Sequence, residues 1–348
     1  MMKVAIIGTG AIVERAHLPS LAALADVEVA VICGRNTERT SVLAREYGIP
    51  LIEAAWRQTI SRADLDAVII ANHNAAHAEI AAAALRAEKH VFCEKPLAVN
   101  ASELETVGAA LAGSDRVFAV NYNMRRLPEL AAIKRAIDAQ EFGALRTLRL
   151  QMRRREGIPG LGSWFTRRDH AGGGAILDLG SHLVDLALWF TAFSPARRLD
   201  GRVWADHGPR QKGGGAWRAS ESDQAFDVDD RAILSWWTDA GVRIDVDVAW
   251  AFHGPEGLYC EVVGDRGGVA LSPATGSSGA TLRYFRETEA GFSEALAEPP
   301  AASASRQAWA TGVEAFIGAC KGDRVDLADY SQAAAGLDLL FRVRDQQG

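Results

Sequence analysis

Short apolar segments alternate with helical segments from the start of the chain to about Tyr122. The apolar segments are short, often rich in β-branched residues, and predicted to be strands at 4–7, 27–33, 67–71, 90–93 and 117–120. Strands that are this short and apolar on both faces are typical of a parallel sheet covered by helices. The strict alternation therefore predicts an α/β domain with a doubly wound parallel sheet.

The pattern changes after residue 124. Helices are predicted at 128–140, 175–190, 309–321 and 331–343, and a loop at 273–279. A long strand is predicted at 146–154, and segments 231–237, 242–250 and 258–263 alternate in polarity like an antiparallel sheet with one buried face. Because 348 residues exceed the usual size of one core, we expect two domains, 1–124 and 125–348. The helix at 331–343 is a candidate to pack back on the first domain.

Composition excludes several functional classes. The net charge of −6 has the wrong sign for a general nucleic-acid binder. The four cysteines are far apart and form no CxxC pair, which argues against a zinc site and suits a reducing compartment. The sequence shows no secretory signal, and no apolar stretch approaches the roughly 20 residues that span a bilayer. We expect a cytoplasmic protein without nucleic-acid or membrane partners.

A glycine-rich turn follows the first predicted strand and opens a helix. In such a turn one glycine permits the tight bend, a second lets the backbone approach a pyrophosphate, and the helix N-terminus attracts the anion. The candidate cofactor-binding residues here are Gly8, Thr9, Gly10, Ala11 and Ile12. The alternative is that glycine ends the strand for local reasons. Val13 stands where a third small residue usually sits, and its bulk would push the helix away from the strand.

The end of the second predicted strand bears on the choice of cofactor. An acidic residue there would bind a ribose 2′-hydroxyl and select NAD, whereas an arginine accommodates a 2′-phosphate. This chain has no acidic residue there but has Arg35, Asn36 and, one turn on, Arg39. The guanidinium fork suits phosphate, so we expect NADP, with NAD possible. The alternative is that both arginines are exposed residues at the start of a helix.

Two features are predicted to carry the chemistry. Glu94 and Lys95 directly follow the strand at 90–93, and ligands of open α/β sheets bind at strand carboxyl ends. A lysine there can stabilise charge on a reacting oxygen, and Pro96 restricts it to extended conformations. The alternative is an exposed lysine in a turn.

The second feature is an apolar helix at 175–190 that carries Asp178, His182 and Asp185 on one face. Such groups are costly on an apolar helix unless they meet water, ligand or partners. His182 is the natural proton carrier, and Asp178 could orient it. The alternative is that His182 is a structural residue of the core whose ring nitrogens have hydrogen-bond partners there.

Histidines also follow the strand at 67–71. Ala71, Asn72, His73 and His77 are predicted to line the nicotinamide or substrate side of the crevice. Metal binding by these residues or by the helix is a weaker interpretation, because no further His/Cys cluster supports it. No metal site is predicted.

Motifs of one known family run through the whole chain in order: Ala5-Ile6-Ile7-Gly8-Thr9-Gly10, His17-Leu18-Pro19, Asp66-Ala67-Val68-Ile69-Ile70 with Asn74 and His77, His90-Val91-Phe92-Cys93-Glu94-Lys95-Pro96-Leu97-Ala98, Gly172-Gly173-Gly174, and Asp178-Leu179-Gly180-Ser181-His182-Leu183-Val184-Asp185. In these motifs the chain resembles the glucose–fructose oxidoreductase, inositol dehydrogenase and rhizopine catabolism (Gfo/Idh/MocA) family. It departs from the family at Val13 and at His73, where proline is usual.

The resemblance implies an N-terminal Rossmann domain and a C-terminal α/β domain with a large, mainly antiparallel open sheet. It implies a homodimer or homotetramer formed through that sheet. Lys95, Asp178 and His182 fall on the family's catalytic positions. The predicted substrate-binding residues are Lys95, Asn123, Arg125, Trp164, Asp178 and His182.

The sequence thus predicts an NAD(P)-dependent oxidoreductase acting on a sugar, polyol or related hydroxylated small molecule. His182 would exchange the hydroxyl proton, Lys95 would polarise the oxygen and Asp178 would orient the site. Three alternatives stay open: a cofactor-binding sensor without turnover, a redox-assisted lyase or glycosidase that retains its cofactor, and a nucleotide-sugar ketoreductase.

Overall fold

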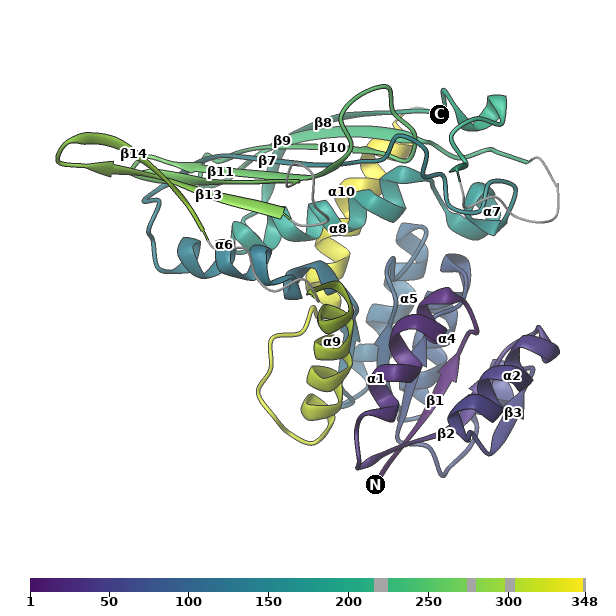
Figure 1. The fold of residues 1–348 in the computed structure, drawn as a ribbon. Helices are drawn as coiled ribbons and strands as arrows, with labels where there is room; N and C mark the ends of the chain where they lie inside the picture. Colours follow the sequence, from purple (N-terminus) through teal and green to yellow (C-terminus); the bar gives the residue numbers. More distant parts are fainter. Residues whose placement is uncertain (216–224, 274–279, 298–303, 347–348) are drawn as a thin grey trace. The chain divides into compact units, whose positions relative to one another are not determined.

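The computed structural model describes residues 1–215, 225–273, 280–297 and 304–346. The chain forms two compact units, and the colours of Figure 1, which follow the residue number, show where the segments of each unit lie. The first comprises Met1–Asn123 and Ser305–Ala334, and the second comprises Met124–Ala304 and Ala335–Gly348. Residues 274–279 of the predicted loop lie outside the described residues.

The first unit contains a parallel sheet, as the alternating pattern predicts, and it has one strand more than the five that were predicted, β3 at its edge. Its strand order is β3-β2-β1-β4-β5-β6. The strands are β1 (Met2–Ile7), β2 (Val27–Cys33), β3 (Leu51–Glu53), β4 (Ala67–Ile70), β5 (His90–Cys93) and β6 (Phe118–Val120). The order reverses direction between β1 and β4, which is the switch point where open α/β sheets bind their ligands.

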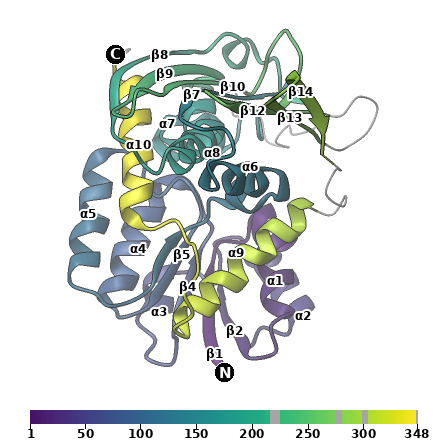
Figure 2. The same cartoon turned by 90° about the vertical axis from the view of Figure 1, so that its left-hand side faces the viewer.

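Helices cover both faces of this sheet. Figure 2 shows α4 (His77–Arg86) and α5 (Ala101–Ala112) on one side of the strands, and α1 (Leu18–Ala22), α2 (Thr37–Tyr47) and α9 (Ala304–Cys320) on the other. A short helix, α3 (Trp56–Ile60), and a 3₁₀ turn, η2 (Asn74–Ala76), complete the unit. Phe316 of α9 stacks on Phe92 of β5, with ring centroids 5.0 Å apart, so a distant helix joins this core.

The helix after the glycine turn is wider than an ordinary α-helix over part of its length. Residues Val13–His17 form a π turn, η1, directly before α1. A π turn holds an extra residue and is often found at functional sites. Val13 is fully buried in the core at this point.

The second unit contains an eight-stranded, mainly antiparallel sheet, as expected. Its order is β14-β13-β12-β11-β7-β10-β9-β8, and only β7 and β10 pair in parallel. The strands are β7 (Leu145–Arg153), β8 (Ala196–Trp204), β9 (Arg231–Thr238), β10 (Arg243–Ala249), β11 (Gly257–Gly264), β12 (Gly267–Pro273), β13 (Ala280–Thr288) and β14 (Gly291–Leu296).

Helices pack on one face of this sheet. In Figure 1, α6 (Pro128–Asp138) and α8 (Ala175–Phe190) lie on the same side of the strands as the end of α10 (Tyr330–Asp345). Short helical segments are η3 (Asn123–Arg126), η4 (Trp164–Thr166), α7 (Arg168–Ala171) and η5 (Gly208–Arg210). The alternating burial of β9 and β10 places their apolar side chains toward α8. Within the described ranges, no helix is long and apolar enough to cross a membrane.

Candidate active site

The glycine turn at the end of β1 is shaped by a close approach to the end of β4. Gly8 has φ +125°, and a Cβ there would lie 2.3 Å from the carbonyl oxygen of Ala71. Only glycine fits this position without displacing the backbone. A Cβ at Gly10, in contrast, would meet no described atom within 4 Å. The turn therefore leaves room for a ligand where the helix begins.

Asn72 adds a polar group beside this turn. Its side-chain Oδ1 is buried and has no hydrogen-bond donor among the described residues. A buried acceptor without a donor costs free energy, so a ligand that supplies one is favoured there. The open space at Gly10, the helix N-terminus and this acceptor together fit a dinucleotide whose phosphates lie against the turn.

The residues after β2 have local roles that the sequence left open. Asn36 is the N-cap of α2, because its Oδ1 accepts a hydrogen bond from the Arg39 backbone N–H at 3.0 Å. The Arg39 guanidinium donates to the Thr9 carbonyl oxygen and pairs with Glu14 at 2.7 Å. Arg35 is exposed. Arg39 therefore links α2 to the glycine turn through its guanidinium.

Glu94 lies in a hydrogen-bonded network that sequence reasoning did not assign. Its Oε1 is 2.8 Å from Nε2 of the fully buried His17 and accepts a hydrogen bond from the Asn121 amide at 2.8 Å. Burial raises the pKa of Glu94, but the contacts with His17, Asn121 and the nearby Lys95 outweigh it and hold that pKa below its ordinary value. The carboxylate therefore stays ionised. The only indication of this role in the sequence is that His17 belongs to the motif His17-Leu18-Pro19.

Lys95 follows Glu94 at the end of β5 and precedes a cis peptide bond to Pro96. The segment is tied to the end of β4 by His77, whose Nδ1 is 2.8 Å from the Pro96 carbonyl oxygen and whose Nε2 is 3.1 Å from that of Asn72. Burial lowers the pKa of His77, so its ring is neutral near pH 7. A neutral imidazole carries a single N–H, so His77 donates a hydrogen bond to one of these two carbonyl oxygens, and its other ring nitrogen lies beside the second.

In the second unit, α8 carries the predicted proton carrier. Of its sixteen residues, only Asp178, His182 and Trp189 are partly exposed, and the others are buried. Asp178 and His182 are separated by one helical turn and share a face. The polar pair therefore lies on the part of an otherwise buried helix that remains accessible.

Asp185, the third polar residue that the sequence places on this helix face, has a partner inside the unit. Arg125 donates to both of its carboxylate oxygens, at 2.8 and 2.6 Å, and both side chains are buried. The guanidinium also lies over the rings of Trp189 and Phe193. This bidentate pair balances the buried charge of Asp185 and explains its presence on an apolar helix.

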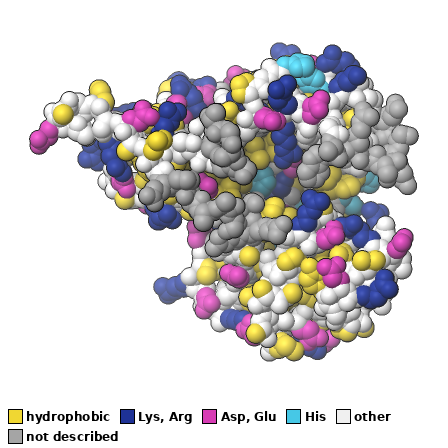
Figure 3. All heavy atoms as spheres, viewed as in Figure 1, with side chains coloured by type: hydrophobic (Ala, Val, Ile, Leu, Met, Phe, Trp, Pro, Cys, Tyr) yellow, Lys and Arg dark blue, Asp and Glu magenta, His cyan; other side chains and the backbone are white. Residues whose placement is uncertain are grey.

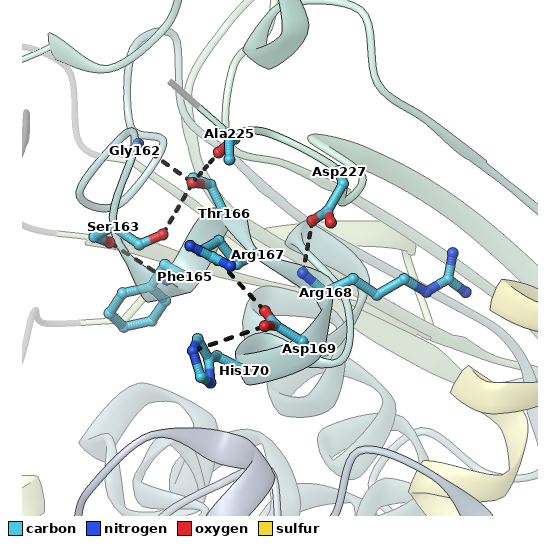
Figure 4. A network of polar contacts seen from close by, with 10 residues as sticks. All are labelled: Gly162, Ser163, Phe165, Thr166, Arg167, Arg168, Asp169, His170, Ala225 and Asp227. Carbon is cyan, nitrogen blue, oxygen red and sulfur yellow. Dashed lines mark hydrogen bonds and ion pairs between the residues drawn. The ribbon is translucent and has the colours of Figure 1, made fainter. Parts of the chain in front are cut away.

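Trp164 lies on a segment that is anchored by Thr166. Figure 4 shows the Thr166 hydroxyl between Gly162, Ser163 and Ala225, within 3.2 Å of a polar backbone atom of each. The segment is joined to Asp227 as well, through the Arg168 backbone N–H at 2.6 Å. The Trp164 ring stacks on Phe165 with centroids 3.8 Å apart. An anchored segment with a stacked aromatic ring is suited to contact a sugar face.

Two further residues of the second unit contact α8. The Asp229 carboxylate accepts hydrogen bonds from the backbone N–H groups of Gly174 and Ile176, both at 2.7 Å, and so caps the helix. The indole Nε1 of Trp250 donates to Asp178 Oδ2 at 2.8 Å. Neither residue carried a functional signal in the sequence. Asp229 is one of two adjacent acidic residues before a predicted strand, and Trp250 is the last residue of another predicted strand.

The predicted residues therefore fall into two groups. The ends of the adjacent strands β1, β4 and β5 bring the glycine turn, Ala71 to His73, and Glu94 with Lys95 to one edge of the first unit. Backbone hydrogen bonds from Ala71 to Ile7 and from Glu94 to Ile70, both 2.8 Å, align these ends. Asp178, His182, Arg125 and Trp164 belong to the second unit, and Asn123 is the last residue of the first segment of the first unit. No group of three or more potential metal ligands occurs in the part of the chain that the structure describes.

Comparison with known proteins matches both units. A family model described as an oxidoreductase family with an NAD-binding Rossmann fold matches residues 2–122. A second model, the GFO/IDH/MocA C-terminal domain, matches residues 130–270.

Several curated and solved relatives are similar over most of their length. Levoglucosan dehydrogenase of Pseudarthrobacter phenanthrenivorans is 31% identical over 75% of this chain and 71% of its own. D-glucoside 3-dehydrogenase of Escherichia coli is 23% identical over 95% of this chain and 91% of its own. A solved levoglucosan dehydrogenase in complex with NADH and levoglucosan superposes with a TM-score of 0.83 at 22% identity, covering 100% of this chain and 98% of that one.

Proposed function

This chain belongs to the Gfo/Idh/MocA family of NAD-binding oxidoreductases, and we propose that it transfers a hydride between nicotinamide and a carbinol or ketone carbon of a sugar or polyol. The observation that carries the proposal is the pair Asp178 and His182, held at an accessible position on the buried helix α8. Relatives named levoglucosan dehydrogenase, D-glucoside 3-dehydrogenase and inositol 2-dehydrogenase support the substrate class.

When bound, the nicotinamide supplies or accepts the hydride. The residues of this chain transfer the hydroxyl proton and stabilise the charge on the reacting oxygen. His182 takes the hydroxyl proton in oxidation and returns it in reduction, through an imidazole ring nitrogen. Lys95 donates a hydrogen bond to the reacting oxygen, Asp178 orients the imidazole, and Trp164 and Asn123 contact the substrate. Arg125, whose guanidinium holds Asp185, supports the helix that carries this pair.

The test is the change in nicotinamide absorbance with purified protein and a panel containing levoglucosan, glucosides and inositols. Since positioned acid–base catalysis contributes ~10²–10⁴-fold, we expect His182→Ala to lower kcat by about that factor while cofactor affinity is kept. His253→Ala, at an exposed histidine, is the matched control. Near-wild-type turnover in His182→Ala would remove this residue from the mechanism.

The same assay separates the alternatives. Product without net change in nicotinamide absorbance, from a tightly held cofactor, would indicate a redox-assisted lyase or glycosidase. Binding of the cofactor without any product would indicate a sensor. Nucleotide-linked sugars are added to the panel, and turnover confined to them would indicate a ketoreductase of that class.

For the cofactor we propose a preference for NADP over NAD. Support comes from the exposed guanidinium of Arg35 and the absence of an acidic residue in the described turn after β2. Arg39 contributes less, because Glu14 balances its charge. The ratio of dissociation constants for the two cofactors, measured by calorimetry, tests this. Arg35→Ala should weaken NADP binding about tenfold and leave NAD binding unchanged. Tighter binding of NAD to the wild-type protein would contradict the proposal.

We also propose a homodimer or homotetramer formed through the C-terminal sheet. The register places Trp237, Val263 and Phe285 on the face opposite to the one that α8 covers, and all three are exposed. Phe292 and Leu296 of β14 are exposed as well, and Figure 3 shows apolar side chains among charged ones where β13 and β14 end the sheet.

Stacked arginines on the same sheet face support this interface. The Arg231 guanidinium lies over the rings of Phe252 and Trp204, at 4.8 and 5.4 Å from their centroids. The Arg153 guanidinium also lies over the Phe252 ring, 5.0 Å from its centroid, and pairs with Asp247. Aromatic residues and arginine are enriched at the energetic centres of protein interfaces.

A cytoplasmic location is proposed from the cysteines. All four are free thiols, and Cys33, Cys93 and Cys260 are buried. Burial raises the pKa of the Cys260 thiol to about 12, so it is unreactive. Free thiols of this kind persist in a reducing compartment. Cell fractionation tests the location.

A further inference from the structure

Trp250 is fully buried just beyond the end of β10, and backbone bonds fix it on both sides. Its N–H donates to the Asp230 carbonyl oxygen at 2.8 Å, and its carbonyl oxygen accepts from the Gly157 N–H at 2.8 Å. The indole therefore projects from a rigid part of the sheet. Its Nε1 donates to Asp178 Oδ2 at 2.8 Å, across 72 residues of sequence.

The chemistry of the two groups gives this bond one direction. An indole nitrogen can only donate, and a carboxylate can only accept. A hydrogen bond to a carboxylate is stronger than one between neutral groups and sets the orientation of the acceptor. The backbone of Asp178 is set separately, because its N–H donates to the Gly174 carbonyl oxygen at 2.9 Å in the helix turn capped by Asp229. Trp250 therefore controls the side chain of Asp178, and the cap controls its backbone.

A second tryptophan shows what a purely structural role looks like. Trp236 of β9 is also fully buried in the sheet core of the same unit. Its indole nitrogen is buried and has no hydrogen-bond acceptor among the residues that the structure describes. Packing alone thus accounts for Trp236, whereas the nitrogen of Trp250 is directed at a residue of the catalytic pair.

We propose that Trp250 is a positioning residue of the hydride-transfer reaction, acting through Asp178. Its indole N–H holds the Asp178 carboxylate in the orientation that the proton transfer by His182 requires. This inference rests on the proposed function, because it assigns Trp250 a task in that reaction. Trp250 lies outside the Glu-Lys-Pro and Asp-x-x-x-His motifs and is distant from both in the sequence, although it contacts Asp178 in space.

Kinetics in a double-mutant cycle test the proposal. Trp250→Phe keeps an aromatic ring, although a smaller one, and removes the hydrogen-bond donor. We expect kcat to fall about ten- to hundredfold with little change in cofactor affinity. In an Asp178→Ala background the same substitution should change kcat less than about twofold, because the group it acts through is gone. Trp236→Phe, the matched control, should leave kcat within about twofold of wild type.

A structural role predicts a different result. If Trp250 only filled space, its substitution would lower kcat by the same factor in both backgrounds, and that additivity would overturn the proposal. Unchanged kcat in Trp250→Phe would overturn it as well. Urea unfolding of each variant gives the stability change separately from the kinetic one.

A spectroscopic readout does not depend on turnover. In protein labelled with ¹⁵N-tryptophan, the Trp250 indole N–H resonance is the one lost in Trp250→Phe. In Asp178→Ala this resonance should move upfield and its hydrogen should exchange faster with solvent, because the acceptor has been removed. A resonance that does not respond would refute the bond itself. Absence of turnover on every sugar tested, with a responsive resonance, would instead refute the proposed function.

Discussion

At the residue scale, the buried carboxylate of Asp229 accepts hydrogen bonds from the backbone at the start of α8. Burial raises its pKa from 3.8 to about 6, although the N–H groups of Ile176 and Gly174 act in the opposite direction. The folded protein therefore binds a proton at higher pH than the unfolded chain does. The contribution of this carboxyl to the stability of the folded state therefore increases as pH falls through about 6 and is lost as pH rises.

We expect this contribution to change by about 2 kcal/mol between pH 7 and about pH 4.5. The measurement is the free energy of urea unfolding across that range for wild type and Asp229→Asn. Other groups titrate in both proteins and cancel in the difference. Wild type should gain stability relative to the variant as pH falls. A difference in unfolding free energy that stays constant with pH would show that the pKa of Asp229 is not raised.

Glu94 shows the opposite balance, because its neighbours stabilise the charge. His17→Ala removes one partner of a buried pair and leaves the carboxylate with Asn121. We expect a loss of about 2–3 kcal/mol in the free energy of unfolding, since the largely buried carboxylate loses one of its hydrogen-bond partners. His17→Gln can still donate to Glu94 and should recover most of the loss. Equal losses in the two variants would mean that packing, not the hydrogen bond, matters at His17.

At the scale of elements, the start of α8 depends on a contact between two backbones. A Cβ at Gly174 would lie 1.7 Å from the Asp229 carbonyl oxygen, although φ at Gly174 is an ordinary −94°. We expect Gly174→Ala to cost at least about 2 kcal/mol of stability and to lower kcat, because the helix that carries Asp178 and His182 must shift. Gly113→Ala, where the added Cβ would lie 3.9 Å from the carbonyl oxygen of Ala110, should cost less than about 1 kcal/mol. Similar losses at the two glycines would contradict this account.

Elements with a clear hydrophobic period could be predicted, and the others could not. The strands β2 and β5 and the helices α6 and α8 lie where the pattern of apolar residues indicates. The strand β3 has only three residues, and β8 and β14 show no regular alternation of burial. A strand at the edge of a sheet pairs through its backbone, so its side chains need not record the pairing.

At the scale of the whole molecule, the exposed face of the C-terminal sheet bears on assembly. We expect Trp237→Glu to place a charge in the proposed interface and to shift the protein toward the monomer mass of 37.3 kDa. Light scattering after size exclusion measures the mass. Val42→Glu, at an exposed position on α2, is the control and should leave the mass unchanged. An unchanged multimer in Trp237→Glu would place the interface elsewhere.

The sequence alone determined the doubly wound first sheet, the mainly antiparallel second sheet, and the positions of Lys95, Asp178 and His182 within motifs. These are local properties, because strand and helix periods and turn residues are set by neighbours in the chain. Tertiary structure alone decided which partners those residues have. His17 meets Glu94 across 77 residues, and Asp229 and Trp250 meet α8 across 55 and 72. Such contacts depend on how elements pack, and packing leaves no period in the sequence.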